Sequence, residues 1–269
     1  MNKLFYVGVF LPLSFIMAQK NKVDNNFLGK YVAQKTSSLY TKFEFDNNGK
    51  VTIGDLIFEE DFFVKDDSLF IIPNKDVLIF KISKNKKTLK GISNWVKDET
   101  WEFENKGVDK RKNDSIAKNK ANLVCEYYVK TRKNKNMFDL ILDADFKKEY
   151  IAVLTDLCDK GYARACGELL GNNMMDEMGG LSVVMGKGKP NKLVENPENI
   201  KLCQRMIELG DTDGYVLLGQ YYFALGKKAE GQKQIDKAIE LGSKNPLLFF
   251  NQNQLEQKTE RIISTPPKR

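Results

Sequence analysis

Histidine is absent from this 269-residue chain. Its absence excludes Ser-His-Asp and Cys-His catalysis, histidine-based zinc sites and proton transfer through imidazole. Cysteine is scarce, and the four cysteines lack the close Cys-x-x-Cys spacing of zinc ligands. Carboxylate pairs, Ser-Lys dyads and substrate-assisted chemistry are not excluded in this way, but none of them has a visible motif. We therefore expect no metal, no cofactor and no enzymatic activity.

Long apolar runs are lacking except at the N-terminus, where Lys3 precedes the apolar residues 4–17 and Ala18 follows them. A basic start, an apolar middle and a small residue at the break predict a cleavable secretory signal over residues 1–18. The alternative is a membrane anchor, but the run is shorter than the roughly 20 residues that span a bilayer, and Pro12 interrupts it. We expect a periplasmic or secreted protein whose mature chain has no transmembrane segment.

Strong charge of one sign is also lacking, since 43 Lys and Arg stand against 36 Asp and Glu. The lysine runs lie in expected turns and in a polar linker, without the aromatic residues that accompany a nucleic-acid-binding face. The mixed signs favour a solvated surface. We expect no nucleic-acid partner.

Residues 23–105 show the alternation of apolar and polar positions that is typical of half-buried strands. The Asp46-Asn47-Asn48-Gly49 segment is typical of a hairpin turn, because Asn and Gly tolerate positive φ. Repeated short segments of this kind predict an antiparallel meander or a small barrel, which has few exposed edges.

Residues 27–104 resemble the lipocalin-like small barrels of secreted bacterial proteins in three respects: the Gly29-x-Tyr31 opening, the strand count, and the last strands with Trp95 and Trp101. The resemblance implies that a small apolar ligand could bind in the barrel mouth. The alternative, which we favour, is an interior filled by aromatic side chains. These would be Phe43, Phe45, Phe62, Phe70, Phe80 and Trp95.

A charged linker at residues 106–114 precedes a change in apolar spacing from two to about 3.6, which predicts helices over residues 115–260 and a loose tail at 261–269. The first helix is marked by Ile116, Lys120, Leu123, Val124 and Tyr127. The expected fold is thus α+β with two domains, an antiparallel β domain followed by an α-helical domain.

The helical half repeats itself. Residues 157–169 are echoed by residues 206–218, and a third copy begins at Ala238. Each copy ends a helix at a glycine that can adopt the left-handed C-cap conformation, and small residues that follow let the next helix pack closely. These glycines are Gly161, Gly210 and Gly242.

The copies resemble Sel-like repeats, the short helical hairpins related to tetratricopeptide repeats. Residues 214–222 and 237–242 match the family pattern well, and residues 165–170 match it less well, with Leu where Gly is expected. The resemblance implies an α-solenoid that binds another protein, as an adapter or scaffold in the cell envelope. The longer interval between the first two glycines indicates an insertion within residues 175–196.

All four cysteines lie in the helical half, and an even count in an exported chain favours disulfides. Cys158 and Cys166 straddle the Gly161 turn, where antiparallel helices would meet, and cysteine-rich Sel-like proteins resemble this chain in bridging cysteines across the same turn. The alternative is two buried thiols. Cys125 and Cys203 are left as a weaker second pair.

Three tyrosines, Tyr215, Tyr221 and Tyr222, lie on the helix that would face a protein partner. Tyr222 matches the packing tyrosine of the Sel-like pattern and is expected in the core, so Tyr221 is the candidate contact residue, since aromatic residues are enriched at interfaces.

Two motifs that suggest other functions are incomplete. Ser115 and Lys118 fit the Ser-x-x-Lys motif of β-lactam-related enzymes, but Ser115 is an ordinary N-cap and the supporting elements are missing. The glycine-rich residues 186–190 lack the order of a phosphate-binding loop. We predict a non-enzymatic protein-binding protein. A carrier of a small apolar ligand, or a cell-wall or β-lactam-related enzyme, is the weaker alternative.

Overall fold

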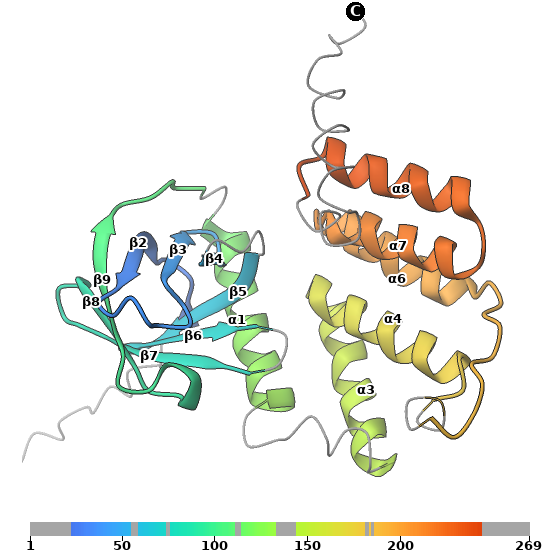
Figure 1. Ribbon diagram of the computed structural model, residues 1–269, viewed down its shortest axis with the longest axis horizontal. Coiled ribbons are helices and arrows are strands. Elements are labelled where there is room, and N and C mark those ends of the chain that lie inside the picture. Colours follow the sequence, from blue (N-terminus) through green and yellow to red (C-terminus); the bar gives the residue numbers. More distant parts are fainter. Residues whose placement is uncertain are drawn as a thin grey trace, which may run out of the picture.

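The computed structural model describes residues 23–54, 59–73, 76–110, 114–132, 144–180, 183 and 186–243, with the backbone alone for residues 114–118 and 144. The predicted signal peptide and the predicted tail lie outside these residues. A β-barrel is followed by a stack of helices, with one helix between them (Figure 1).

The strands of the described residues form one antiparallel sheet of nine strands. They are β1 (Val23–Asp24), β2 (Leu28–Ala33), β3 (Lys42–Asp46), β4 (Lys50–Ile53), β5 (Glu59–Lys65), β6 (Ser68–Ile72), β7 (Leu78–Ile82), β8 (Thr88–Gly91) and β9 (Thr100–Asn105). The order β5-β4-β3-β2-β9-β8-β7-β6 closes into an eight-stranded barrel because β5 also pairs with β6. The short β1 pairs with the far end of β5. The prediction of an antiparallel small barrel is confirmed.

Aromatic side chains fill the barrel interior. Phe43 lies 5.4 Å from Trp101 and 5.2 Å from Phe80 between ring centroids, and Phe45 lies 5.1 Å from Phe62. All five side chains are fully buried. Such edge and tilted ring contacts add to the stabilisation from buried area.

Two of the aromatic residues predicted to lie in the interior do not lie there. In β6, Leu69 and Ile71 point inward, so the alternation of the strand turns Phe70 outward, where it stacks on Phe63 at 4.6 Å. Trp95 lies in the short 3-10 helix η1 (Asn94–Val96) and is 54% exposed.

The helices are α1 (Asp114–Tyr127), which continues as the π-helix η2 (Tyr128–Arg132), then α3 (Ala144–Asp159), α4 (Ala163–Glu177), α6 (Pro197–Glu208), α7 (Asp213–Ala224) and α8 (Lys228–Glu240). From α3 onward each helix packs on the next one in this series (Figure 1). The long connection between α4 and α6 coincides with the predicted insertion. None of the described helices has both the length and the apolar character needed to cross a bilayer.

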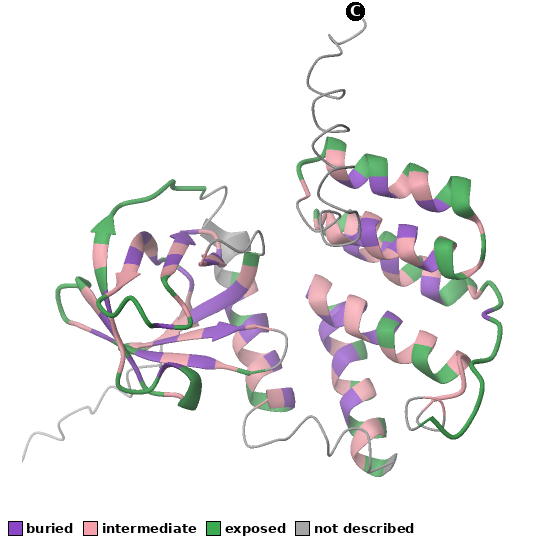
Figure 2. Cartoon of the chain, viewed as in Figure 1, coloured by how far each residue is buried: buried purple, intermediate pink, exposed green. Residues whose placement is uncertain are grey.

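The barrel and the helices share one hydrophobic cluster. Helix α1 packs against β1 and β5, and Val124 and Tyr127 of this helix join Phe63 and Ile72 of the barrel and Leu154 of α3. Figure 2 shows buried residues in the strands and along the helices on both sides of this junction. The shared cluster couples the two halves in one hydrophobic unit.

Glycines bring the last three helices close together. A Cβ atom on Gly214 of α7 would lie 2.8 Å from the Cys203 carbonyl oxygen of α6, and one on Gly219 would lie 2.9 Å from the Gly231 oxygen of α8. These separations are too short for any side chain, so the close helix packing depends on glycine.

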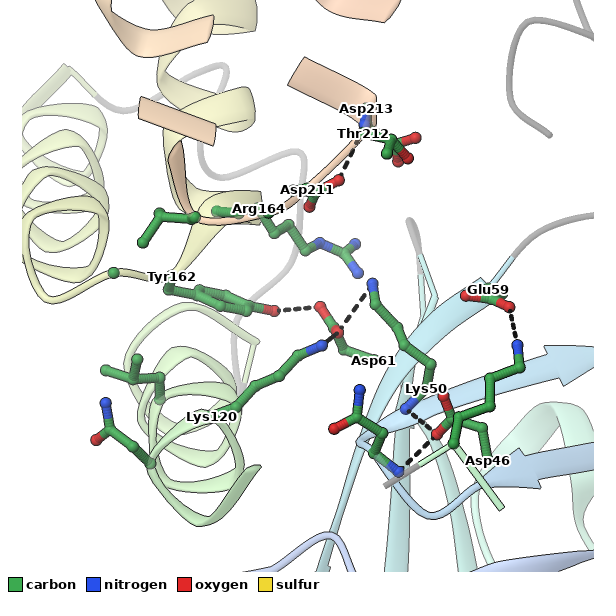
Figure 3. Close-up of a pocket in the computed structure, with 18 of the residues that line it drawn as sticks. Asp46, Lys50, Glu59, Asp61, Lys120, Tyr162, Arg164, Asp211, Thr212 and Asp213 are labelled. Carbon is green, nitrogen blue, oxygen red and sulfur yellow. Dashed lines mark hydrogen bonds and ion pairs between the residues drawn. The ribbon is translucent and has the colours of Figure 1, made fainter. Parts of the chain in front are cut away.

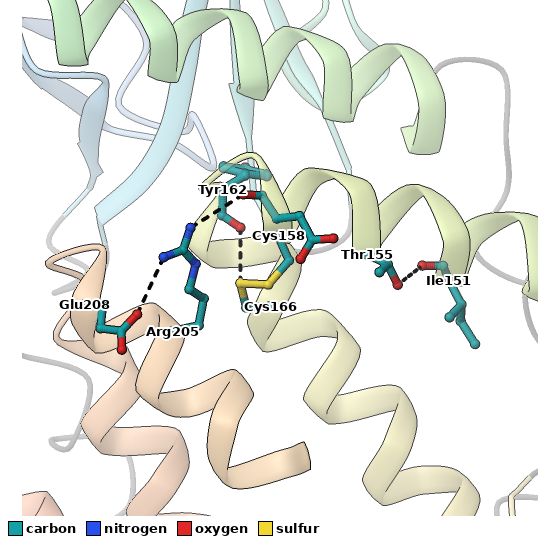
Figure 4. Close-up of a disulfide and its surroundings, with 8 residues drawn as sticks. Ile151, Thr155, Cys158, Tyr162, Cys166, Arg205 and Glu208 are labelled. Carbon is teal, nitrogen blue, oxygen red and sulfur yellow. Dashed lines mark hydrogen bonds and ion pairs between the residues drawn. A yellow bond between two sulfur atoms is a disulfide. The ribbon is translucent and has the colours of Figure 1, made fainter.

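Cys158 at the end of α3 and Cys166 in α4 form a disulfide, with an S–S distance of 2.04 Å and a Cα–Cα distance of 4.9 Å (Figure 4). The suggested second pair does not form, since Cys125 and Cys203 are free thiols. They pack in different places: Cys203 lies in a small cluster with Leu170, whereas Cys125 packs against the cluster shared with the barrel.

The assignment of Tyr221 as a contact residue is wrong. Its side chain is fully buried, and its hydroxyl accepts a hydrogen bond from the backbone amide of Asn196 at 2.7 Å. Tyr222, which was expected in the core, is only half-buried. Tyr221 instead packs the α4–α6 connection onto α7.

Candidate functional site

The three glycine turns that the repeat pattern singled out have the same hydrogen bonds. In each turn, the glycine amide donates a hydrogen bond to the carbonyl oxygen three residues earlier, and the next amide donates one to the carbonyl oxygen five residues earlier. The pairs are Gly161 to Cys158 and Tyr162 to Leu157, Gly210 to Ile207 and Asp211 to Met206, and Gly242 to Ile239 and Ser243 to Ala238. This is the Schellman cap, and the glycine φ values of 96°, 78° and 84° explain why glycine occupies each turn.

All three turns line one cleft of about 510 Å³ (Figure 3). The opposite wall is formed by the barrel at β4 and β5 and by α1. Residues 160–164, 209–213 and 242–243 come from the turns, Lys50, Asp61 and Lys110 from the barrel side, and Asn119 and Lys120 from α1.

The carboxylate of Asp61 joins four elements around the cleft (Figure 3). Its Oδ1 atom lies 3.1 Å from Nζ of Lys50 on β4 and 3.5 Å from Nζ of Lys120 on α1. Its Oδ2 atom accepts a hydrogen bond of 3.0 Å from the hydroxyl of Tyr162, in the first turn. Because Asp61 is only 4% exposed, this group is a buried ionic connection between barrel and helices.

Charge and burial have opposing effects on the pKa values of Asp61, Lys50 and Lys120. Burial alone would raise the pKa of Asp61, but attraction to Lys50 and then to Lys120 and Arg164 holds it well below its usual range. Burial would lower the pKa of Lys50, but attraction to Asp61 raises it. Burial lowers the pKa of Lys120, and repulsion from Lys50 lowers it further, against the attraction of Asp61. The two ammonium groups therefore compete for one carboxylate.

Arg164 fastens the start of α4 to the end of β6. Its NH1 group donates to the carbonyl oxygen of Ile72 at 2.6 Å, and its NH2 group donates to that of Pro73 at 3.3 Å. Its Nε group donates to Glu168 at 3.2 Å. These bonds fix the first turn of the helical stack against the barrel.

The barrel wall of the cleft is shaped by the predicted hairpin turn between β3 and β4. The Asp46 carboxylate accepts hydrogen bonds from the backbone amides of Asn48 at 2.8 Å and Lys50 at 3.0 Å. Asn47 and Gly49 have the positive φ values that the Asn-Asn-Gly sequence predicts. Beside this turn, Lys110 and Glu59 form an ion pair of 2.9 Å.

The facing wall carries carboxylates from the second turn. Oδ1 of Asp211 accepts a hydrogen bond of 3.0 Å from the backbone amide of Asp213. Oδ1 of Asp213 accepts one of 3.4 Å from the hydroxyl of Ser243, which links the second turn to the third. Both walls of the cleft therefore carry charges of both signs, with Lys50 and Lys120 next to Asp61 on one side and Asp211 and Asp213 next to Arg164 on the other.

The sequence indicated the turns but not the charged group between them. Lys120 occupies one of the positions that mark the apolar face of the first predicted helix, and a charge at such a position signals a buried partner. Asp61 follows two other acids and directly precedes a buried strand segment, a weaker signal. Ser115 lies in the first turn of α1, and its side chain is outside the described residues.

Comparison with known proteins gave no match: no family model, no curated protein and no solved structure matches this chain. The resemblances to Sel-like repeats and to lipocalin-like barrels thus stay predictions from the residues. The cleft has to be interpreted from its own geometry.

Proposed function

We propose that this protein is an exported, non-enzymatic adapter that binds a segment of another polypeptide in the cleft between its barrel and its hairpin turns. The observation that carries the proposal is the arrangement of the turns. Three turns with the same cap, separated in the chain by the α4–α6 connection and the α7–α8 turn, line the same cleft of about 510 Å³.

The cleft suits a polypeptide in size and polarity. Its volume lies in the range of roughly 300–1,000 Å³ that is usual for ligand sites, enough for a few residues of an extended chain. Its walls combine charged side chains with turn backbone, and polypeptides supply matching charges and amide groups. The wall from the turns is held by backbone hydrogen bonds, so little ordering is needed on binding.

The alternative of an apolar ligand in the barrel has less support. The residues that face the interior, among them Phe43, Phe45 and Trp101, are fully buried against one another. A ligand there would have to displace packed side chains, at a cost similar to that of disrupting a protein core.

Photo-crosslinking from the cleft tests the proposal. A photoreactive residue would replace Asn119, which is exposed and lines the cleft, in a protein of residues 19–269 that is then mixed with cell-envelope extract. The matched control places the same residue at Asn122, which is also exposed on α1 but does not line the cleft.

We expect one protein to be crosslinked from position 119, to be absent from the position 122 sample, and to be displaced by excess unmodified protein. Asn119→Trp should abolish retention of that protein on a column, whereas Asn122→Trp should preserve it. Equal crosslinking from both positions, or none, would contradict the proposal.

A further inference from the structure

The lysine pair above Asp61 has binding capacity that Asp61 does not use. Lys50 and Lys120 share one carboxylate oxygen, and their side chains remain 28% and 30% exposed where they line the cleft. Each ammonium group has three donors, so donors remain after the contact with Asp61. Asp61 is the carboxylate that both ammonium groups contact directly, so the remaining donors of the pair can bind an acceptor that enters the cleft.

The other cationic groups of the cleft are already paired. Lys110 is bound to Glu59, and Lys160 is bound to Glu126 at 2.9 Å and to Asp156 at 2.7 Å. Arg164 is bound to Glu168 at 3.2 Å and to Glu60 at 3.5 Å. A carboxylate that enters the cleft would therefore meet its strongest attraction at Lys50 and Lys120.

The opposite wall limits which anions can enter. Asp211 extends from the second turn, and its carboxylate is held by a neutral donor, the backbone amide of Asp213. It is near enough to attract both Lys50 and Lys120 electrostatically and to raise their pKa values in part. A ligand with negative charge alone would be repelled by Asp211, and one with positive charge alone would be repelled by the lysines.

We infer that the cleft binds a zwitterionic peptide segment, whose carboxylate lies between Lys50 and Lys120 and whose ammonium or guanidinium group faces Asp211. The inference rests on the proposed function, and it names the chemistry by which the cleft selects its ligand. Removing either charge from the ligand removes the compensation on one wall.

Peptides with blocked ends test the inference. The probes are Lys-(Gly)n-Glu peptides with n from 0 to 3, acetylated and amidated, with matched peptides that carry norleucine in place of lysine or glutamine in place of glutamate. Calorimetry with residues 19–269 measures their affinities. We expect one spacer length to bind best, and loss of either charge to weaken binding about tenfold or more, as for close charge pairs.

Two variants assign the charges to the walls. Lys120→Gln should weaken binding of peptides with glutamate and leave binding of those with glutamine unchanged. Asp211→Asn should weaken binding of peptides with lysine and leave binding of those with norleucine unchanged. Both substitutions keep a hydrogen-bonding side chain. Lys90→Gln, on an exposed position of β8, is the control and should change nothing.

A spectroscopic readout accompanies the affinities. Binding of a carboxylate should raise the pKa of Lys120, which now faces Asp61, Lys50, Asp211 and Asp46, and lysine side-chain NMR measures that change. Equal affinities for charged and neutral peptides, or no binding of any probe, would overturn the inference. The adapter function is tested independently by crosslinking from position 119, so failure of the peptide experiments would leave it in place.

Discussion

The barrel and the helical half reach stability in different ways. One cluster of fifteen buried residues fills the barrel, and strands that are distant in sequence contribute to it. The helices share an equally large cluster with the outer face of the barrel, but their later members have small clusters, such as the one of Leu170, Cys203 and Leu218, together with glycine contacts, turn caps and one disulfide. A barrel core of this kind leaves little room for a ligand, whereas caps made by the backbone leave the turn side chains available for binding.

The largest difference in stability between the two halves is expected when a large aromatic residue is removed from each. Phe43 is fully buried in the barrel, and Phe223 on α7 is 36% exposed. Phe43→Ala should lower the free energy of unfolding by about 3–5 kcal/mol, because it removes ring contacts and leaves a cavity. Phe223→Ala should cost much less. Urea unfolding of both variants measures this, and equal losses would show that the barrel core is not the dominant source of stability.

Asp61 tests the connection between the two halves. Asp61→Asn should cost about 3 kcal/mol at pH 7, because Lys50 and Lys120 lose the charge that compensates them. The folded pKa of Asp61 is lowered, so its contribution is complete above the ordinary pKa of about 3.9 and is lost as pH falls further.

Wild type should therefore lose stability in acid more steeply than Asp61→Asn, in urea unfolding at pH 7 and pH 3. Asp67→Asn is the control, since Asp67 pairs with Lys81 on the exposed outside of the barrel. It should follow the wild-type pH dependence closely. A variant at Asp61 with the same acid slope as wild type would contradict the ionic role of this carboxylate.

The disulfide should matter more to the helical half than to the barrel. Replacing Cys158 and Cys166 together by Ser should cost about 2 kcal/mol, because the crosslink closes a short loop and so restricts the unfolded chain only modestly. Amide exchange should rise in α3 and α4 before it rises in the barrel. If the barrel strands lost protection to the same extent, the two halves would unfold as one unit, and the comparison between them would fail.

The smallest effect should come from a glycine that has no close neighbour. Gly171 in α4 has nothing within 4 Å of an added Cβ atom, so Gly171→Ala should stabilise the protein by about 0.5–1 kcal/mol through helix propensity. Gly219→Ala is the matched contrast, since its Cβ would lie 2.9 Å from the Gly231 oxygen. This variant should lose at least about 1 kcal/mol by overpacking. Thermal melts of both variants would show whether close glycine contacts hold the helices together.

Much of the fold could be predicted because its signals are local. The Asn47 to Gly49 turn and the alternation in β3 specify a hairpin by themselves, and each C-cap glycine ends its own helix. The outward position of Phe70 depends on strand register, which is set by Leu69 and Ile71 on the same strand and their partners across the barrel. Register between strands is not visible in a single segment, so the assignment of Phe70 was wrong.

The candidate site could be predicted only in part for the same reason. The glycines of the three turns were visible in the sequence, but their position opposite β4 and β5 is a tertiary property. Asp61 and Tyr162 are separated by 101 residues, and no local pattern joins them. Tyr221 was misassigned because α7 is apolar around most of its circumference, so its sequence gives no sign of which side a neighbour will cover.

The shared cap of the three turns also makes the cleft wall extensible. Each hairpin ends in the same backbone geometry on the same side of the stack, so one further hairpin would lengthen the wall by two helix spacings of about 8–10 Å each. The lysine pair on the barrel side would stay in place. The number of hairpins would then set the length of the cleft, and with it the length of the ligand segment that the protein can bind.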